Sequence, residues 1–215
     1  MAETVFTIGH STHTQEYFIS LLSLHGITAL CDVRSMPHSR VNPQFNRKEL
    51  EQALRAHGME YRFLGKELGA RSDDPTCYEH GKVQYERLAE TELFRYGLKR
   101  VLRGTKEGFR IALMCAEKEP LECHRTILVA RHLVTSGLDV QHIHADGKLE
   151  SHIDAENRLV QTFKLTEDDM FCSREELLAE AYHRQGERIA YEVRPAVAED
   201  ESTTRRAAGL PPRTS

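Results

Sequence analysis

The sequence predicts an α/β protein built on a single open, mainly parallel sheet with flanking helices, of the Rossmann-like or flavodoxin-like kind. Short β-branched and apolar runs such as 5–8 are each followed by an amphipathic stretch of helical length. The strand comes first in every pair, and this alternation favours parallel strands joined by right-handed crossovers. After Gly147 the pattern changes, because the remaining periodic segments are helical and have no strands between them.

Each element has its own signal in the chain. Strands are expected at about 4–9, 27–33, 59–64, 109–115 and 139–144, where the apolar runs lie. Helices are expected at about 14–25, 47–57, 82–103 and 123–136, and a polar loop precedes the third of them. Asn46 is a good cap for the second helix, and Gly137 stands where the fourth helix should end.

The chain divides into three parts. Residues 1–150 form the α/β domain, and residues 151–194 form a helical extension with helices at about 150–163 and 173–192. Residues 195–215 contain Pro195, Pro211 and Pro212, lack periodicity and are predicted to be disordered. We expect that this tail can be removed without loss of the fold.

Composition limits the classes of protein to consider. Hydrophobic and charged contents of 40% and 29% are ordinary for a soluble globular protein. No apolar run approaches the roughly 18 residues that a membrane helix needs. The five cysteines are an odd number and suit reduced thiols, and no secretory signal opens the sequence, so a cytoplasmic location without membrane contact is expected. The net charge of -4 does not indicate nucleic-acid binding, but it allows a small basic pocket for one anionic group.

Polar residues follow almost every predicted strand. In open α/β sheets, ligands bind beyond the carboxyl ends of the strands, so we expect these residues to share one cavity. The candidates at the strand ends and in the loops that follow are Gly9, His10, Ser11, Asp32, Arg34, Ser39, Arg40, Cys115, Glu117 and Asp146.

The most distinctive stretch runs from Cys115 to Arg125. Cys115 and Glu117 end the fourth strand, and Cys123, His124 and Arg125 open the following helix. A thiol at a helix N-terminus has a lowered pKa, so Cys123 is a candidate nucleophile. The same backbone N–H groups could hold an anion, with Arg125 as a clamp. In the alternative interpretation, Cys115 is a core thiol, since free cysteines are often buried.

Asp32 and Arg34 lie two residues apart, so they share one face of a strand. The acid could transfer a proton, and Arg34 and Arg40 could bind an anion. His10 adds a titratable imidazole beside the permissive Gly9. The alternative is structural: ion pairs often tie strand ends to loops, and acids could neutralise the arginines so that nothing else binds.

Zinc is a further possibility, because cysteine and histidine are its usual ligands. The spacing from Cys115 to Cys123 and His124 lacks the short Cys-x2–4-Cys pair that is typical of structural zinc. No metal ligands are therefore expected from the sequence, and no cofactor is indicated.

The motifs of the chain resemble those of the DUF488 family, a bacterial and archaeal family without an established biochemical activity. The residues that carry the resemblance are Thr7-Ile8-Gly9-His10-Ser11, Asp32-Val33-Arg34 with Pro37, Ser39 and Arg40, Phe45, Cys115-x-Glu117, Cys123-His124-Arg125, His142-Ile143 and Asp146-Gly147. The end of the last helix, Arg188 to Tyr191, is also similar to the tails of many members. The resemblance implies a shared site at these positions but no particular reaction.

Three functions fit these observations. The first is an enzyme acting on a small anionic or nucleotide-like substrate, with Cys115 or Cys123 as nucleophile, or with His10, Asp32 and Glu117 in acid–base catalysis. The second is a binding module for a nucleotide or a nucleic-acid end, without chemistry. The third is a metal-binding or redox-sensing thiol protein. Oligomeric state is not indicated.

Overall fold

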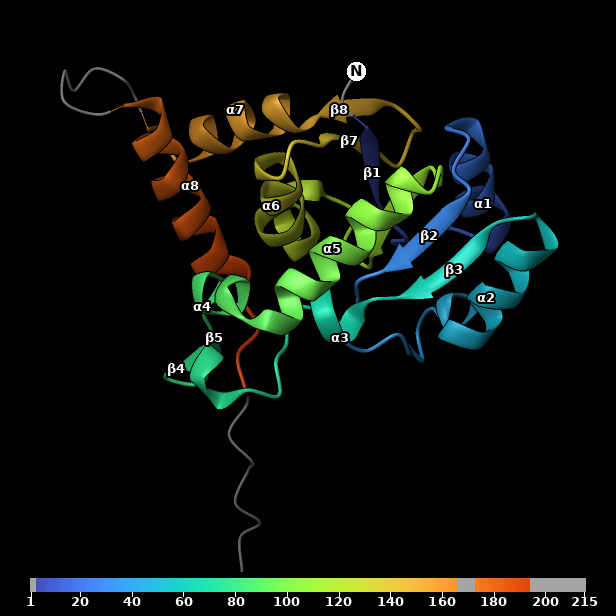
Figure 1. The fold of residues 1–215 in the computed structure, drawn as a ribbon, viewed down its shortest axis with the longest axis horizontal. Coiled ribbons are helices and arrows are strands. Elements are labelled where there is room, and N and C mark those ends of the chain that lie inside the picture. Colours follow the sequence, from blue (N-terminus) through green and yellow to red (C-terminus); the bar gives the residue numbers. More distant parts are fainter. Residues whose placement is uncertain (1–2, 166–172, 194–215) are drawn as a thin grey trace, which may run out of the picture.

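The computed structural model describes residues 3–165 and 173–193, and a six-stranded sheet lies at its centre (Figure 1). The strands are β1 (Thr4–Gly9), β2 (Ala29–Asp32), β3 (Glu60–Phe63), β6 (Ile111–Cys115), β7 (Asp139–Ile143) and β8 (Leu149–Ser151). The first five run parallel, whereas β8 pairs antiparallel with β7. The predicted open, mainly parallel α/β sheet is therefore confirmed.

The strand order across the sheet is β3-β2-β6-β1-β7-β8. Strand β6 lies between β1 and β2, whereas a Rossmann order places the first two strands side by side. As a result, the C-terminal end of β1 lies directly beside that of β6. The backbone pairing continues beyond the strands, because His10 N donates to Cys115 O at 2.9 Å and Ser11 N donates to Ala116 O at 2.9 Å.

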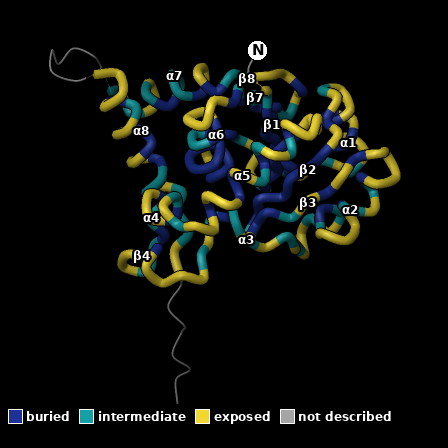
Figure 2. Tube along the Cα trace, in the orientation of Figure 1, coloured by how far each residue is buried: buried dark blue, intermediate teal, exposed yellow. Residues whose placement is uncertain are grey.

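Helices cover both faces of the sheet because strand residues alternate between them. On one face, α1 (Gln15–Leu24) and α2 (Arg47–Ala56) pack on Phe6 and Ile8 of β1. On the other face, Val5 belongs to a larger apolar cluster with residues of α5 (Glu92–Lys106), a π-helix at Arg125–Ala130, α6 (Arg131–Thr135), α7 (His152–Thr162) and α8 (Arg174–Ile189). Figure 2 shows the central strands buried between these layers.

Three predicted boundaries need correction. The helix expected at 82–103 is split into α4 (Tyr85–Glu90) and α5, because the Thr91 side chain accepts a hydrogen bond from Phe94 N and caps a new helix. The polar loop before it contains α3 (Gly65–Leu68) and a short hairpin of β4 (Tyr78–Glu79) and β5 (Lys82–Val83). The helix expected at about 150–163 begins at His152 as α7, because Leu149–Ser151 form β8, which pairs with β7 in the main sheet.

Two residues, Gly137 and Asn46, were expected from the sequence at helix ends, and only Gly137 has the expected role. Gly137 adopts a φ of 91°, as expected of a residue that ends a helix. Asn46 stands at the N-cap of α2, but its side chain makes no capping hydrogen bond. Its Oδ1 atom accepts a hydrogen bond from Ser39 N at 2.7 Å instead, and so fixes the loop between β2 and α2.

The C-terminal helices pack against the core of the sheet domain. Ala155 and Leu159 of α7 and Ala181 of α8 are buried in its larger apolar cluster. After α8 the chain returns to β5, where Val83 N donates to Tyr191 O at 2.9 Å. The tail predicted to be disordered, residues 195–215, lies outside the described residues. None of the helices in residues 3–165 and 173–193 combines the length and apolar character that crossing a bilayer requires.

A chain of buried polar side chains links the sheet to α7 and α8. Thr7 Oγ1 lies 2.8 Å from His142 Nδ1, and His142 Nε2 lies 3.0 Å from His152 Nδ1. Tyr182 Oη continues the chain at 2.9 Å from His152 Nε2 and donates to Glu156 Oε1 at 2.9 Å. Burial lowers the pKa of His152 to about 4. Burial and the neighbouring His152 also lower the pKa of His142 well below its usual value.

The buried histidines of this hydrogen-bonded row predict that the protein loses stability when the pH is lowered. The folded pKa of His152 lies below the value of about 6.5 for an unfolded histidine, so the unfolded chain binds more protons between these two values. Stability should therefore fall as the pH drops from about 6.5 to 4, by up to roughly 3 kcal/mol from this residue. Urea unfolding at several pH values measures it. His152→Gln should reduce the slope of the unfolding free energy against pH by the equivalent of about one proton. The control His183→Gln, at an exposed residue, should leave this slope unchanged. Equal slopes for the wild type and His152→Gln would contradict the assignment.

Candidate functional site

A pocket of about 310 Å³ lies at the C-terminal ends of the central strands. Arg34 follows β2, and Cys115 ends β6. Cys123 and His124 come from the turn before the π-helix, and Tyr191 follows α8. The pocket is therefore built from segments that are distant in the sequence, and it lies where a parallel sheet is expected to bind ligands.

Two thiols and one imidazole form the innermost part of this pocket. His124 Nδ1 lies 3.7 Å from Cys115 Sγ and 3.9 Å from Cys123 Sγ. The other ring nitrogen, Nε2, lies 3.0 Å from Val33 O, an arrangement that orients the ring and directs Nδ1 toward the sulfur atoms. Both cysteines are almost fully buried, at 4% and 1% exposure. Neither of them forms a disulfide bond.

The local sequence explains why the two cysteines meet. The apolar run 111–115 forms a buried strand that ends at Cys115. Pro120 then begins a single 3-10 turn, Pro120–Glu122, and the turn brings Cys123 back to the strand end. Cys123 Sγ accepts a hydrogen bond from Arg125 N at 3.5 Å, so a backbone donor at the start of the helix does face the thiol. The helix begins as a π-helix, a rare form that is frequent at functional sites.

The two thiols differ in the direction in which their surroundings shift the pKa. Burial and the adjacent Cys123 raise the pKa of Cys115 well above its usual value. Burial alone would raise the pKa of Cys123 too, but hydrogen bonding with Cys115 and the charge of Arg125 lower it well below its usual value. Cys123 Sγ lies 3.0 Å from Glu117 Oε2, and partial burial together with Cys123 raises the pKa of Glu117. Cys123 Sγ donates this hydrogen bond to Glu117, and Cys123 forms a thiolate more readily than Cys115 does.

Behind the thiols, Arg34 lies in a closed polar network. Its Nε and NH2 atoms donate to the carboxylate of Asp32 at 2.9 and 2.6 Å. NH2 also donates to Phe45 O at 2.8 Å, and NH1 lies 3.1 Å from His10 Nε2. Tyr61 Oη donates to Asp32 at 2.8 Å. Burial lowers the pKa of His10 to about 4, so His10 is neutral near pH 7.

Arg125 does not reach the pocket predicted for it as an anion clamp. Its side chain is fully buried, and it donates to Glu117 O at 2.7 Å and Lys118 O at 3.3 Å. These hydrogen bonds fix the loop that carries Glu117. The guanidinium thus binds backbone carbonyls instead of a ligand, and its charge acts on Cys123 from inside the protein.

The outer wall contains residues that the sequence did not indicate. Arg71 stacks over the ring of Tyr191 at 4.0 Å, and both line the pocket. Two glycines bring the 65–71 segment to this position: a Cβ atom on Gly65 would lie 2.0 Å from Arg34 O, and one on Gly69 would lie 2.4 Å from Ser35 Oγ. The spacing of these glycines was the available signal, since glycine permits close approach of backbone to a neighbour.

Other candidates from the sequence lie away from the pocket lining. Asp146 is exposed in the turn between β7 and β8 and pairs with Lys148 at 3.0 Å. Ser39 stabilises its own loop by accepting a hydrogen bond from Asn42 N at 3.1 Å. Arg40 is exposed, and Gly9 and Ser11 contribute backbone to the junction of β1 with the loop after β6. Of the candidates from the sequence, Arg34, Cys115, Glu117, Cys123 and His124 line the pocket, whereas His10, Asp32 and Arg125 are not among its lining residues.

Comparison with known proteins identifies the family of this chain. The family model described as "Domain of unknown function DUF488" matches residues 14–132, more than half of the sequence. The chain belongs to the DUF488 family. Neither the curated proteins nor the solved structures include a match to this DUF488 protein. The matched segment contains Arg34, Arg71, Cys115 and Cys123, whereas Tyr191 lies outside it.

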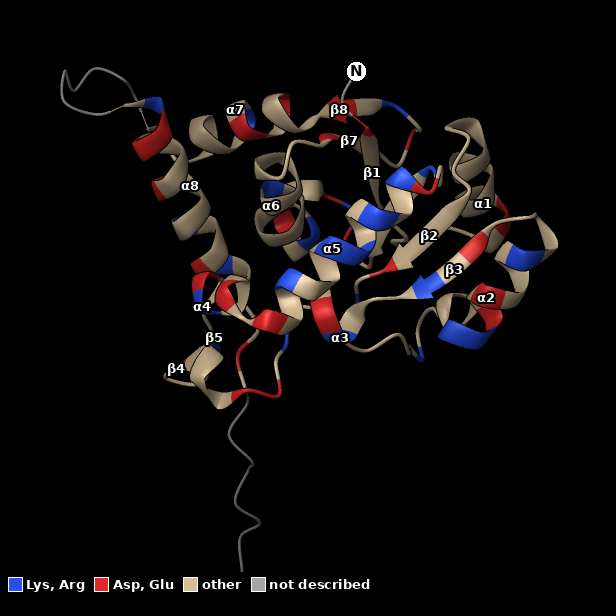
Figure 3. Ribbon diagram, viewed as in Figure 1, with Lys and Arg blue, Asp and Glu red and all other residues tan. Residues whose placement is uncertain are grey.

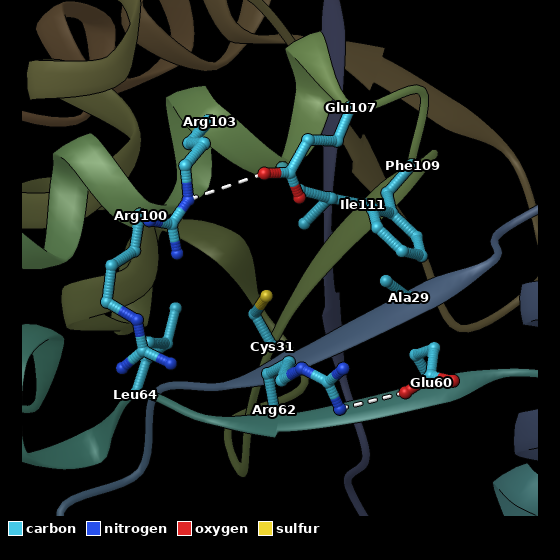
Figure 4. A pocket seen from close by; sticks show the side chains of 11 residues that line it. Ala29, Cys31, Glu60, Arg62, Leu64, Arg100, Arg103, Glu107, Phe109 and Ile111 are labelled. Carbon is cyan, nitrogen blue, oxygen red and sulfur yellow. Dashed lines mark ion pairs between the residues drawn. The ribbon is translucent and has the colours of Figure 1, made fainter.

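A second pocket of the DUF488 protein, about 210 Å³ in volume, lies between α5 and the sheet (Figure 4). Its lining includes Ala29, Glu60 and Ile111, which are the first residues of β2, β3 and β6. It is therefore at the opposite ends of the strands from the thiol pocket. None of the motif residues predicted at the strand ends lines it.

Each charged side chain of this second pocket has an ion-pair partner. Basic residues gather along α5 (Figure 3). The ion pairs of the lining are Arg62–Glu60 at 2.8 Å, Arg103–Glu107 at 3.5 Å, and Arg100 with Glu67. Cys31 lies within the pocket, and burial raises its pKa to about 12. A protonated thiol among neutralised charges is a poor candidate for chemistry, so the thiol pocket is the candidate functional site.

Proposed function

We propose that this DUF488 protein is an enzyme that acts on a small anionic or nucleotide-like substrate, with Cys123 as its nucleophile. The observation that carries the proposal is the meeting of Cys115, Cys123 and His124 in a pocket that also contains Arg71. Four of the five cysteines are free thiols in the structure, which suits a reducing compartment such as the cytoplasm.

Each group has a role in the proposed reaction. Cys123 Sγ gives its proton to Glu117 Oε2, 3.0 Å away, and forms a bond to an electrophilic atom of the substrate as the bond from that atom to the leaving group breaks. Glu117 then gives this proton to the leaving group. His124 and Cys115 stabilise the thiolate before attack, and a water molecule releases the product from Cys123 and returns a proton to Glu117. Glu117 suits proton transfer because its pKa is raised from the ordinary glutamate value.

The substrate class follows from the outer part of the pocket. No carboxylate pairs with Arg71 within the described ranges of the chain, so its guanidinium has donors for an anion. The rings of Tyr85 and Tyr191 also line the pocket and suit a planar or apolar part of a ligand. The Arg34 guanidinium is already paired with Asp32 and also contacts His10 and Phe45 O, so Arg71 is the stronger candidate for binding the substrate anion.

Alkylation tests the nucleophile and the charge preference together. Among the four described cysteines, we expect iodoacetate to modify Cys123 alone. The ratio of the iodoacetate rate to the rate of neutral iodoacetamide should be higher for Cys123 than for a free thiol such as glutathione. Intact-mass measurement and peptide mapping give the rates. Cys123→Ser should abolish this modification, and Arg71→Ala should remove the preference for the anionic reagent without lowering the iodoacetamide rate more than about twofold.

Internal controls are available in the same chain. Cys77 is fully buried, and Cys31 lines the second pocket, where burial raises its pKa to about 12 and so disfavours the reactive thiolate. Both should therefore stay unmodified while the protein is folded. If the four described thiols react at similar rates, or if Cys115 reacts instead of Cys123, the proposed nucleophile is wrong. Protection of Cys123 by individual nucleotides or sugar phosphates in the same assay would then rank candidate substrates.

A further inference from the structure

The arrangement of Cys115, Cys123 and His124 has the dimensions of a metal site. The two sulfur atoms and His124 Nδ1 all lie within 4.8 Å of one another, and the two S–N distances are 3.7 and 3.9 Å. In a tetrahedral zinc site with the usual bond lengths, neighbouring ligand atoms are roughly 3.5–3.8 Å apart. One nitrogen almost equally distant from two sulfur atoms is the spacing expected around a common ion.

The hydrogen-bond contacts of His124 also suit a metal ligand. A histidine that binds a metal through one ring nitrogen almost always donates a hydrogen bond from the other, often to a backbone carbonyl. His124 Nε2 lies 3.0 Å from Val33 O, and this leaves Nδ1 for the ion. Arg125 N donates to Cys123 Sγ at 3.5 Å and would orient that ligand. The ligands thus have supporting contacts before any ion binds.

Charge and burial favour a soft divalent ion. Two thiolates neutralise a divalent cation, which a buried site requires because an uncompensated charge is costly there. Thiolate and imidazole donors select zinc over magnesium or calcium, which prefer oxygen. The sequence spacing gave no indication of zinc because the cysteines are eight positions apart, but the fold brings the end of β6 beside the start of the π-helix.

We propose that Cys115, Cys123 and His124 bind one Zn²⁺ ion. Glu117 is a candidate for a fourth ligand, since it lines the same pocket and its Oε2 atom lies 3.0 Å from Cys123 Sγ. This inference goes beyond the proposed enzymatic function, because the ion would bind whether or not the site is catalytic. Bound Zn²⁺ would occupy both thiolates, so it would protect Cys123 from alkylation.

Titration with Co²⁺ tests the site directly. The full-length protein is reduced and stripped of metal with a chelator, and Co²⁺ is added while absorption is recorded. We expect one equivalent to produce thiolate-to-cobalt charge-transfer bands and the visible bands of tetrahedral Co²⁺. One equivalent of Zn²⁺ should remove them, whereas millimolar Mg²⁺ or Ca²⁺ should not.

Variants locate the ligands. Cys115→Ser and Cys123→Ser should each weaken Co²⁺ binding at least tenfold, and the double variant should lose the charge-transfer bands. Cys31→Ser is the matched control, since it removes a buried thiol elsewhere and should bind normally. Circular dichroism checks that each variant is folded. His124→Asn is a further test of the third ligand. If His124→Asn does not fold, the cysteine variants alone decide whether the metal site exists.

The outcomes separate this inference from the proposed function. Absence of the cobalt bands in the wild type, or bands that persist in the double cysteine variant, would overturn the metal site. Selective alkylation of Cys123 in the metal-free protein could still support the enzyme. Conversely, cobalt bands with unselective alkylation would support the metal site alone. Zn²⁺ should slow iodoacetate modification of Cys123 at least tenfold if both are right.

Discussion

Replacing Arg34 by methionine is expected to destabilise the protein by about 3–5 kcal/mol, because it leaves a buried carboxylate without its partner. Asp32 is fully buried, and Arg34 supplies two of the hydrogen bonds that its carboxylate oxygens accept. In the variant, Tyr61 Oη and the backbone N–H of residue 34 would remain as donors to Asp32 from the described part of the chain. Arg34 also ties β2 to Phe45 O, so the loop before α2 would lose a contact as well.

Urea unfolding measures this loss, and the chain offers a matched control. Arg62 pairs with Glu60 at 2.8 Å, but both side chains are more than half exposed. Arg62→Met should therefore cost less than about 1 kcal/mol. Combining Asp32→Asn with Arg34→Met should cost less than Arg34→Met alone, since no buried charge is left unpaired. A loss below 1 kcal/mol for Arg34→Met would show that the network does not stabilise the fold.

Replacing Gly9 by alanine should have a second large effect, about 3 kcal/mol or more, because no space exists for the methyl group. A Cβ atom at this position would lie 1.8 Å from Glu117 O and 2.8 Å from Glu117 C. The neighbour is backbone that Arg125 holds from the other side, so it cannot move freely. The substitution should therefore displace the loop that carries Glu117 and slow the alkylation of Cys123.

Gly186 of α8 provides the comparison. A Cβ atom there would lie 3.4 Å from Tyr85 Cδ2, an ordinary contact, and the residue is inside a helix. Gly186→Ala should stabilise the protein by about 0.5–1 kcal/mol, the usual helix preference for alanine. Thermal unfolding of both variants measures the contrast. If Gly9→Ala is as stable as wild type and is alkylated at the same rate, the close packing of β1 on this loop is wrong.

The sequence predicted the parallel core of the fold well, because its strands are continuous apolar runs followed by amphipathic helices. Strand β8 was missed because its three residues, Leu149–Ser151, contain one apolar side chain and give no period. The break between α4 and α5 was missed because the helical period continues across Thr91. Such features depend on a single cap or on tertiary pairing, which periodicity does not report.

The candidate site was predictable where it follows strands directly. Cys115, Cys123 and His124 all line the thiol pocket. Arg125 was assigned to the same pocket, but successive helical residues point about 100° apart, so it faces the interior instead. Arg71 and Tyr191 could not be assigned, because one lies in a loop and the other follows the last described helix. Their meeting depends on how distant segments pack.

The late position of Ile189 and Tyr191 in the chain has a consequence for biosynthesis. Both residues line the thiol pocket, and Tyr191 is set in place by backbone pairing with β5. Chains fold from the N-terminus as they leave the ribosome, so the sheet that carries Cys115 can form before these residues emerge. The nascent chain therefore passes through a stage in which its reactive thiols lack one wall of their pocket. We expect this stage to be the most vulnerable to oxidants, and ribosome-bound chains stopped before residue 189 should be the most readily alkylated.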